Sequence, residues 1–139
     1  MARKSSKASP KLPGIYIVTL NNIEPISVNA QDPRIADKCI KVDMRHCKIG
    51  KAKDLATRKR NYEKTFGPHN VNFVPLISIA EIDGAERIIL SRLDSFRIRG
   101  KTGRRNEWLE GISADEAVCI VRSAIADLGF STALSHLNR

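Results

Sequence analysis

The sequence predicts a small domain of the α/β (α+β) class, in which a central, three-stranded, mainly antiparallel sheet is flanked by helices. Three apolar segments rich in β-branched residues predict the strands, and three segments with apolar residues at helical spacing predict the helices. The chain has 139 residues, enough for one domain and too few for two of ordinary size. We therefore expect a single domain at residues 12–139, preceded by a flexible basic tail at residues 1–11.

The first two strands are predicted by β-branched and alternating patterns. Residues 14–20 read Gly-Ile-Tyr-Ile-Val-Thr-Leu and are closed by two asparagines, which is typical of a strand followed by a turn. Residues 23–37 hold two prolines and no sustained period, so they predict a loop or an insertion. Apolar and polar side chains alternate over residues 39–49, which indicates a second strand that ends at Gly50.

A helix, a third strand and a second helix are expected next. From Asp54 the apolar residues recur at helical spacing until the Gly-Pro pair at 67–68, which ends the helix. Residues 71–82 are mostly apolar and β-branched, and Pro75 among them implies an edge strand or a bulge. After a turn at residues 83–84, an apolar stripe predicts the second helix.

The clearest local signal predicts the C-terminal helix. Ser113 and Glu116 have the spacing of a capping box, in which each side chain binds a backbone N–H at the start of a helix. Apolar residues then recur at helical spacing until Gly129, which is typical of a helix end. A helix over residues 113–128 is therefore expected to pack one face on the core.

The net charge of +9 is concentrated in a few segments of the chain. There are 24 Lys and Arg residues against 15 Asp and Glu residues. The tail, residues 45–64 and residues 97–105 are rich in basic side chains, and residues 100–105 read as a basic loop. Such clusters predict a polyanionic partner, while the alternative is a solvated surface that only keeps the protein soluble.

Neither a membrane anchor nor a disulfide scaffold is predicted. No apolar run approaches the roughly 18 residues of a membrane helix, and the N-terminus lacks the apolar core of a signal peptide. We therefore expect the protein in the cytoplasm or the nucleoid, without a membrane partner. Cys39, Cys47 and Cys119 are odd in number and lack zinc-ligand spacing, so they are expected to be reduced, mostly buried thiols.

Two basic residues depart from their local patterns. Arg58 lies three residues after Leu55 and four before Tyr62, within the apolar stripe of the first predicted helix. A half-buried guanidinium needs an anionic partner, so Arg58 either binds a ligand or pairs with a core carboxylate or extends to solvent. Strand alternation places Lys48 on the same side as His46 and Gly50, beside the turn that enters this helix.

These residues carry a resemblance to a known family. Gly14-Ile15-Tyr16, together with Lys48-Ile49-Gly50 and the run Gly-Lys-Ala-Lys-Asp-Leu that leads to Arg58 and Tyr62, resembles the GIY-YIG nuclease superfamily. The run is also similar to the nuclease domain of the nucleotide-excision repair endonuclease. Lys48 stands where the second tripeptide usually begins with tyrosine. This departure and the Glu107-Trp108 pair resemble a KIG-containing phage and bacterial branch, so the resemblance covers roughly residues 13–112.

The resemblance implies a GIY-YIG-like fold and a site that hydrolyses phosphodiesters. It implies that the Tyr16 phenol takes a proton from the attacking water or holds that water in line. Lys48 then supplies a nearby positive charge, and Arg58 stabilises charge on the scissile phosphate. The alternative is that Tyr16 is an ordinary strand aromatic. The long spacing between Tyr16 and Lys48 implies an insertion at residues 21–43.

A carboxylate is also needed to hold a divalent cation. Glu86 lies at the start of the helix on which the superfamily places its metal-binding glutamate, and it is the first choice. Glu107 is the second choice, with a structural pair to an arginine as its alternative role. One carboxylate with water and phosphate oxygens suits Mg²⁺ or Mn²⁺.

The sequence therefore predicts a metal-dependent DNA endonuclease. The alternative is a catalytically inactive nucleic-acid-binding module of the same fold, and a basic protein-interaction domain is a third possibility. Sequence-specific cleavage by so small a domain is expected to need a homodimer or a partner protein. His46, Gly50 and Tyr62 are expected to support the site. The residues expected to contact DNA are Lys51, Lys53, Arg60, Arg97, Arg99, Lys101, Arg104 and Arg105.

Overall fold

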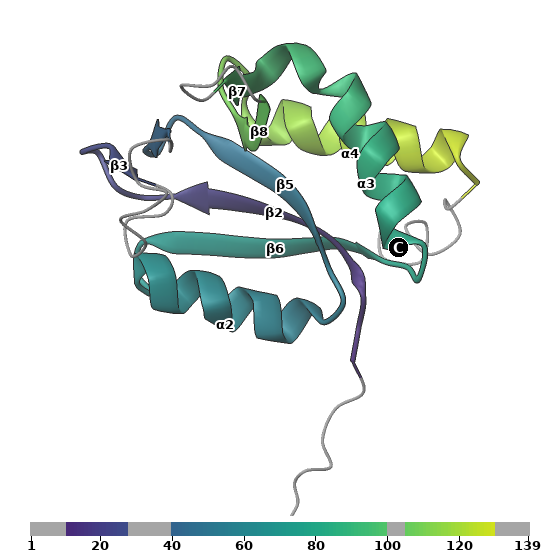
Figure 1. Ribbon diagram of the computed structural model, residues 1–139, viewed down its shortest axis with the longest axis horizontal. Helices are drawn as coiled ribbons and strands as arrows, with labels where there is room; N and C mark the ends of the chain where they lie inside the picture. The colour runs from purple at the N-terminus through teal and green to yellow at the C-terminus, as the bar shows by residue number, and fades with distance from the viewer. Residues whose placement is uncertain (1–10, 28–39, 100–104, 130–139) are drawn as a thin grey trace, which may run out of the picture.

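The computed structural model contains a five-stranded antiparallel sheet with helices on both faces (Figure 1). It describes residues 11–27, 40–99 and 105–129 of the chain. The strands of this sheet follow the order β6-β2-β5-β8-β7, and β3 pairs with β4 in a separate two-stranded sheet. In chain order the elements are β2 (Gly14–Leu20), β3 (Ile26–Ser27), β4 (Lys41–Val42), β5 (Cys47–Ala52), α2 (Leu55–Phe66), β6 (Val71–Ser78), α3 (Ile82–Arg92), a 3-10 turn (Asp94–Phe96), β7 (Arg97–Arg99), β8 (Arg105–Leu109) and α4 (Ala114–Asp127).

The predicted three-stranded sheet is wrong, because β8 and β7 extend it to five strands. The three predicted strands correspond to β2, β5 and β6, and β8 pairs with β5 at Cys47 and Lys48. Strands β7 and β8 pair at Arg97 with Leu109 and at Arg99 with Arg105, so Arg105 of the predicted basic loop belongs to a strand, whereas residues 100–104 lie outside the described residues. The Arg-Ile-Arg pattern of β7 lacks an apolar strand signal, so its pairing depends on the neighbouring strand.

Strand β2 lies between β5 and β6, and this position determines the surroundings of Tyr16. Tyr16 pairs with Gly50 on β5 and with Pro75 on β6. The register shifts between Ile15 and Tyr16, and β6 is the edge strand of the sheet. Pro75 is thus accommodated both by an edge position and by an adjacent irregularity, in agreement with the expectation from the sequence.

The second strand and the second helix differ from their predicted bounds. Strand β5 continues through Gly50 to Ala52, and Lys41–Val42 forms the separate strand β4. Gly50 does not end the strand, because β5 stays paired with β2 beyond it, up to Ala52 opposite Gly14. The ring of Tyr16 occupies the space that a side chain at Gly50 would take. Helix α3 already begins at Ile82, so residues 83–84 form its first turn. Most of the predicted tail and insertion, with Cys39, lies outside the described residues.

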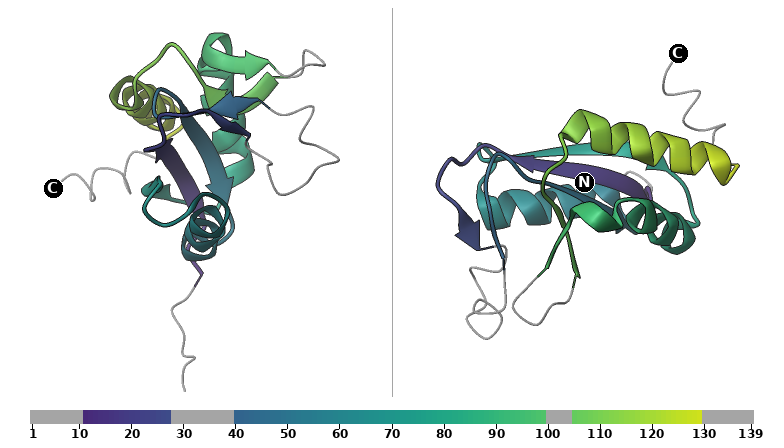
Figure 2. Two further views of the ribbon diagram at one scale, coloured as in Figure 1. Left: turned by 90° about the vertical axis from the view of Figure 1, so that its left-hand side faces the viewer. Right: turned by 90° about the horizontal axis from the view of Figure 1, so that it is seen from above.

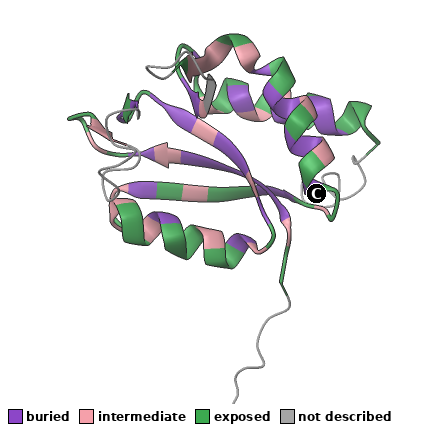
Figure 3. Cartoon of the chain, in the orientation of Figure 1, coloured by how far each residue is buried: buried purple, intermediate pink, exposed green. Residues whose placement is uncertain are grey.

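Two hydrophobic cores lie on opposite faces of the sheet. Helix α2 covers one face, and α3 and α4 cover the other (Figures 1 and 2). Because successive strand residues alternate between faces, Tyr16 packs with Tyr62 of α2 while Ile15 and Ile17 pack with Ile89 of α3. The buried residues of the strands and of the sheet-facing sides of the helices are purple in Figure 3. Packing in the two cores therefore holds α2 and α3 on opposite faces of the sheet.

The two cysteines in the described residues differ in burial. Cys47 is buried in β5, whereas Cys119 is exposed on α4. The expectation of mostly buried thiols is therefore wrong for Cys119, because position 119 lies away from the α4 face that carries Ala117 and Val121.

Within the described ranges, none of the helices combines the length and the apolar character needed to cross a membrane.

Helix α4 begins at the predicted capping box, and this contact gives a stability prediction. The Ser113 hydroxyl accepts a hydrogen bond from the Glu116 N–H at 3.1 Å, and a Glu116 carboxylate oxygen accepts one from the Ser113 N–H at 3.0 Å. We expect Ser113→Ala to lower the free energy of unfolding by about 1 kcal/mol, because the Glu116 N–H at the helix start loses its side-chain acceptor. Urea unfolding measures this change. The control is Ser123→Ala at an exposed position within α4; an equal loss in both variants would contradict the capping role.

Candidate active site

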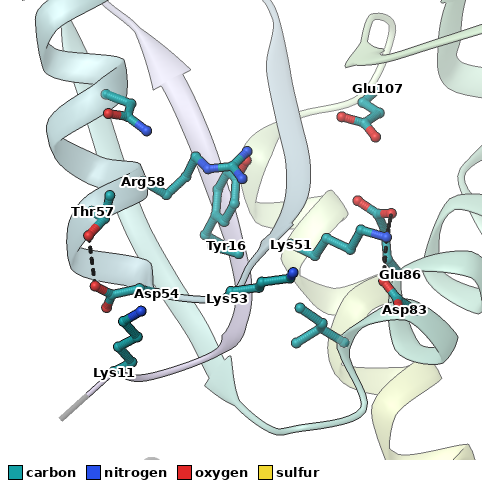
Figure 4. A pocket seen from close by; sticks show the side chains of 13 residues that line it. Lys11, Tyr16, Lys51, Lys53, Asp54, Thr57, Arg58, Asp83, Glu86 and Glu107 are labelled. Carbon is teal, nitrogen blue, oxygen red and sulfur yellow. Dashed lines mark hydrogen bonds and ion pairs between the residues drawn. The ribbon is translucent and has the colours of Figure 1, made fainter.

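A cleft of about 500 Å³ lies between the start of α2 and the start of α3, beside the ends of β2 and β5. Four residues predicted to act in catalysis or metal binding line it, namely Tyr16, Arg58, Glu86 and Glu107. They come from β2, α2, α3 and β8, and Figure 4 shows their side chains around the same space. The fold therefore brings together four residues that are widely separated in the sequence.

Tyr16 is held by aromatic and hydrogen-bond contacts. Its ring stacks on Phe73 with 4.5 Å between centroids, and it meets Tyr62 edge-on at 5.6 Å. The two phenol oxygens of Tyr16 and Tyr62 are 2.9 Å apart, within hydrogen-bond distance. The ring lies over Gly50, where any Cβ would overlap the phenol. Only a glycine at position 50, in the second tripeptide, therefore leaves room for the ring of Tyr16, in the first tripeptide.

Both phenols of this pair are neutral at physiological pH. Burial is the largest cause that raises the pKa of Tyr16 well above its ordinary value, and Tyr62 adds to it, while the charges of Lys48 and Arg58 oppose it. Burial likewise raises the pKa of Tyr62 to about 12. The pair can therefore donate and accept hydrogen bonds, but neither phenol supplies a resident phenolate.

Arg58 is the half-buried cation of the cleft. It lies on α2 between the buried residues Leu55 and Tyr62, as the helical spacing predicts, and its guanidinium extends toward Tyr16 (Figure 4). Within the described ranges, its side chain makes no hydrogen bond or ion pair. A guanidinium without a protein anion in a cleft is suited to an anionic ligand.

Glu86 and Glu107 both reach the cleft, although the sequence presents them as alternatives. The Glu86 side chain is 11% exposed, whereas that of Glu107 is 40% exposed. Burial is the largest cause that raises the pKa of Glu86, the charge of Glu107 raises it further, and Lys51 opposes both. The charges of the two carboxylates therefore interact, and Glu86 is the more buried of the two.

Lys48 and Lys51 contact these glutamates from opposite faces of β5. Lys48 lies 3.6 Å from Glu107 and 5.1 Å from the centre of the Tyr62 ring, and it does not line the cleft. Lys51 lines the cleft, where its ammonium lies 3.5 Å from Glu86 and donates a hydrogen bond to Asp83. Glu107 and Glu86 thus lie beside different lysines, and Lys51 is shared between Glu86 and Asp83.

The remaining basic residues predicted to bind DNA occupy several different environments. Lys53 lines the cleft, and Arg60 is exposed on α2, where it donates to the Thr57 hydroxyl at 3.1 Å. Arg97 is half-buried 3.5 Å from Asp94, and Arg99 is exposed at the end of β7. Lys101, Arg104 and the side chain of Arg105 lie outside the described residues. Lys53 and Arg60 are therefore the predicted DNA contacts nearest to Arg58 in the chain.

His46 does not belong to the cleft. It is buried in the turn before β5, where its Nδ1 accepts a hydrogen bond from the Asp43 N–H at 3.0 Å. Its Nε2 lies 3.9 Å from a Glu110 carboxylate oxygen. His46 is predicted to support the site. Its contacts show that it stabilises the turn before β5, which leads to Lys48.

Sequence reasoning missed Asp83 and Thr57, which both line the cleft. Thr57 donates to the Asp54 carboxylate at 2.7 Å and orders the first turn of α2. Asp83 lies three residues before Glu86, a spacing that puts both carboxylates on one side of a helix. That spacing could have identified Asp83 if the start of α3 had been placed at Ile82.

A comparison with protein families relates this arrangement to known proteins. The T5orf172 domain matches residues 15–125, a range that includes Tyr16, Arg58, Glu86 and Glu107. This domain is nuclease-like and related to the GIY-YIG domains. Neither the curated proteins nor the solved structures yield a match. Because the matched range covers most of the chain and extends from β2 into α4, the protein belongs to the T5orf172 domain family.

Proposed function

We propose that this protein is an endonuclease of the GIY-YIG type that hydrolyses DNA phosphodiester bonds with the help of a divalent cation. The observation that carries the proposal is the convergence of Tyr16, Arg58 and Glu86 on one cleft. A hydrogen-bonding phenol, a guanidinium that has no anionic partner among the described residues and a buried carboxylate are the three groups that such a reaction uses. Membership of a nuclease-like domain family supports the same activity.

The protein side chains have distinct roles in the proposed reaction. Water attacks phosphorus in line and gives up a proton to solvent, while the bond to the O3′ oxygen breaks and O3′ takes up a proton from solvent, which leaves a 5′-phosphate and a 3′-hydroxyl. Tyr16 accepts a hydrogen bond from the attacking water and holds it in line, because its raised pKa keeps the phenol neutral. Tyr62 orients that phenol across their 2.9 Å contact. Arg58 binds the phosphate oxygens on which negative charge develops.

The carboxylates of the cleft fit a divalent cation of the Mg²⁺ or Mn²⁺ type. Glu86 supplies a hard oxygen ligand at the border between core and cleft, and Glu107 adds a second negative charge close by. When bound, such a cation supplies Lewis-acid stabilisation of the phosphate. Glu86 is the residue that would hold it, and Lys48 would keep the charge of Glu107 balanced.

The proposal is tested by incubation of the full chain with supercoiled plasmid and MgCl₂, MnCl₂ or EDTA. We expect open-circular and linear products with either metal and none with EDTA, separated on an agarose gel. The products should accept a radioactive 5′-phosphate from polynucleotide kinase only after phosphatase treatment, because their 5′ ends already carry phosphate. Retarded but uncut plasmid under all three conditions would instead favour a binding module.

A further inference from the structure

Lys51 places one ammonium between two carboxylates at the start of α3. It donates a hydrogen bond to Asp83 and lies 3.5 Å from Glu86. The two carboxylates differ in their surroundings, because the side chain of Asp83 is 76% exposed and that of Glu86 is 11% exposed. Figure 4 shows the Lys51 side chain crossing from β5 to both of them. The same cation is therefore shared by an exposed anion and a buried one.

The local structure explains why the ammonium can contact both carboxylates. Asp83 and Glu86 are three residues apart in α3, so their side chains are neighbours on one side of the helix. Lys51 lies near the end of β5, on the strand face opposite to Gly50, where the sheet faces α3. A small rotation of the flexible lysine stem is enough to favour either partner.

Glu86 needs a positive partner whether or not a metal ion is bound. A buried carboxylate close to a second negative charge, that of Glu107, is costly unless a cation balances it. Lys51 provides this balance in the free protein. A divalent cation on Glu86 would repel the ammonium at this distance. The lysine must therefore lose its contact with Glu86 when the metal binds and keep only its other anionic partner.

We infer that Lys51 is a resident counter-ion of Glu86 that a divalent cation displaces, and that Asp83 is a positioning residue that holds the displaced ammonium. The inference rests on the proposed function, in which Glu86 binds the metal. The exchange is one of charges only: the metal ion takes the position beside Glu86, and the ammonium keeps its hydrogen bond to Asp83. No proton or covalent bond changes.

The exchange predicts opposite effects of two substitutions on Mn²⁺ binding by the free protein. Lys51→Met removes the competing cation, so we expect Mn²⁺ to bind about fivefold more tightly. Asp83→Asn removes the second anchor and leaves Lys51 on Glu86, so we expect Mn²⁺ to bind about fivefold more weakly. In the Lys51→Met background, Asp83→Asn should change the affinity by less than about twofold, because the ammonium is gone.

A matched control separates this exchange from a simple effect of charge. Glu81→Gln removes an exposed acidic charge from the same helix start, and within the described ranges Glu81 forms no ion pair with Lys51. It should leave Mn²⁺ binding nearly unchanged. If Asp83→Asn weakens binding equally with and without Lys51, then Asp83 acts as a ligand or through its own charge, and the inference is overturned.

The test uses the full chain without DNA. Free Mn²⁺ is measured by electron paramagnetic resonance during titration, and circular dichroism confirms that each variant is folded. Absence of Mn²⁺ binding in the wild type and in Lys51→Met would overturn the exchange. Plasmid cleavage is assayed in parallel: cleavage with an unresponsive Mn²⁺ affinity refutes the exchange alone, whereas the expected binding pattern without cleavage refutes the proposed endonuclease alone.

Discussion

We expect the Arg58→Ala variant to cleave DNA at least about a hundredfold more slowly than the wild type at saturating DNA. The guanidinium faces the cleft and, within the described ranges, has no anionic partner, so its charge is available to the transition state. Its loss should affect the rate more than the affinity, because ground-state binding is distributed over several basic residues. Single-turnover plasmid cleavage gives the rate, and filter binding gives the affinity.

Arg60→Ala is the matched control for Arg58. Arg60 is an exposed arginine two residues further along α2 that donates to Thr57. Its removal should weaken DNA binding modestly and leave the rate at saturation unchanged. An Arg58→Ala protein that is folded and cuts at the wild-type rate would sink the proposed mechanism, and an unfolded one would show that Arg58 serves the core of α2. Arg58→Lys, which keeps the charge, separates the two readings because it should stay folded and still cut slowly.

The second large effect is expected at Glu86. We expect Glu86→Gln to abolish metal-dependent cleavage and to weaken Mn²⁺ binding in the absence of DNA, because an amide is a poor ligand for a hard cation in place of a carboxylate. Glu86 is the less exposed of the two glutamates in the cleft. Titration with Mn²⁺ and plasmid cleavage together measure both effects.

Glu107→Gln provides the comparison for Glu86. The charge of Glu107 is balanced by Lys48 at 3.6 Å, so its removal should lower stability or DNA affinity more than the rate. The opposite pattern, in which only Glu107→Gln is inactive and fails to bind Mn²⁺, would show that the metal ligand lies on β8 and not on α3. Both substitutions remove one negative charge, so the comparison is independent of net charge.

The elements predicted from the sequence are those whose signals are local. The start of α4 follows from the capping box of Ser113 and Glu116, and the end of α2 follows from Gly67, whose positive φ leaves the helix. Strand β2 follows from its β-branched run. In each case the deciding contacts lie within a few residues of one another, so a local pattern is sufficient.

The pairing of β7 and β8 could be recognised only from the tertiary structure. Strands β7 and β8 are short, and their sequences carry arginines in place of an alternating apolar pattern. They are strands because β5 offers β8 an open edge, and β8 then pairs with β7. The continuation of β5 through Gly50 has a similar cause, since β2 pairs with β5 on both sides of that glycine, from Cys47 to Ala52.

For the cleft, the tripeptide motif pointed to Tyr16 and a cation in an apolar stripe pointed to Arg58, while the resemblance to the GIY-YIG superfamily offered Glu86 and Glu107 as alternatives. Only the tertiary structure decided how the two lysines of β5 are used. Lys48 and Lys51 are an odd number of residues apart, so they project from opposite faces of the strand. Which carboxylate each lysine reaches depends on which element lies over that face, and strand alternation alone carries no information about that packing.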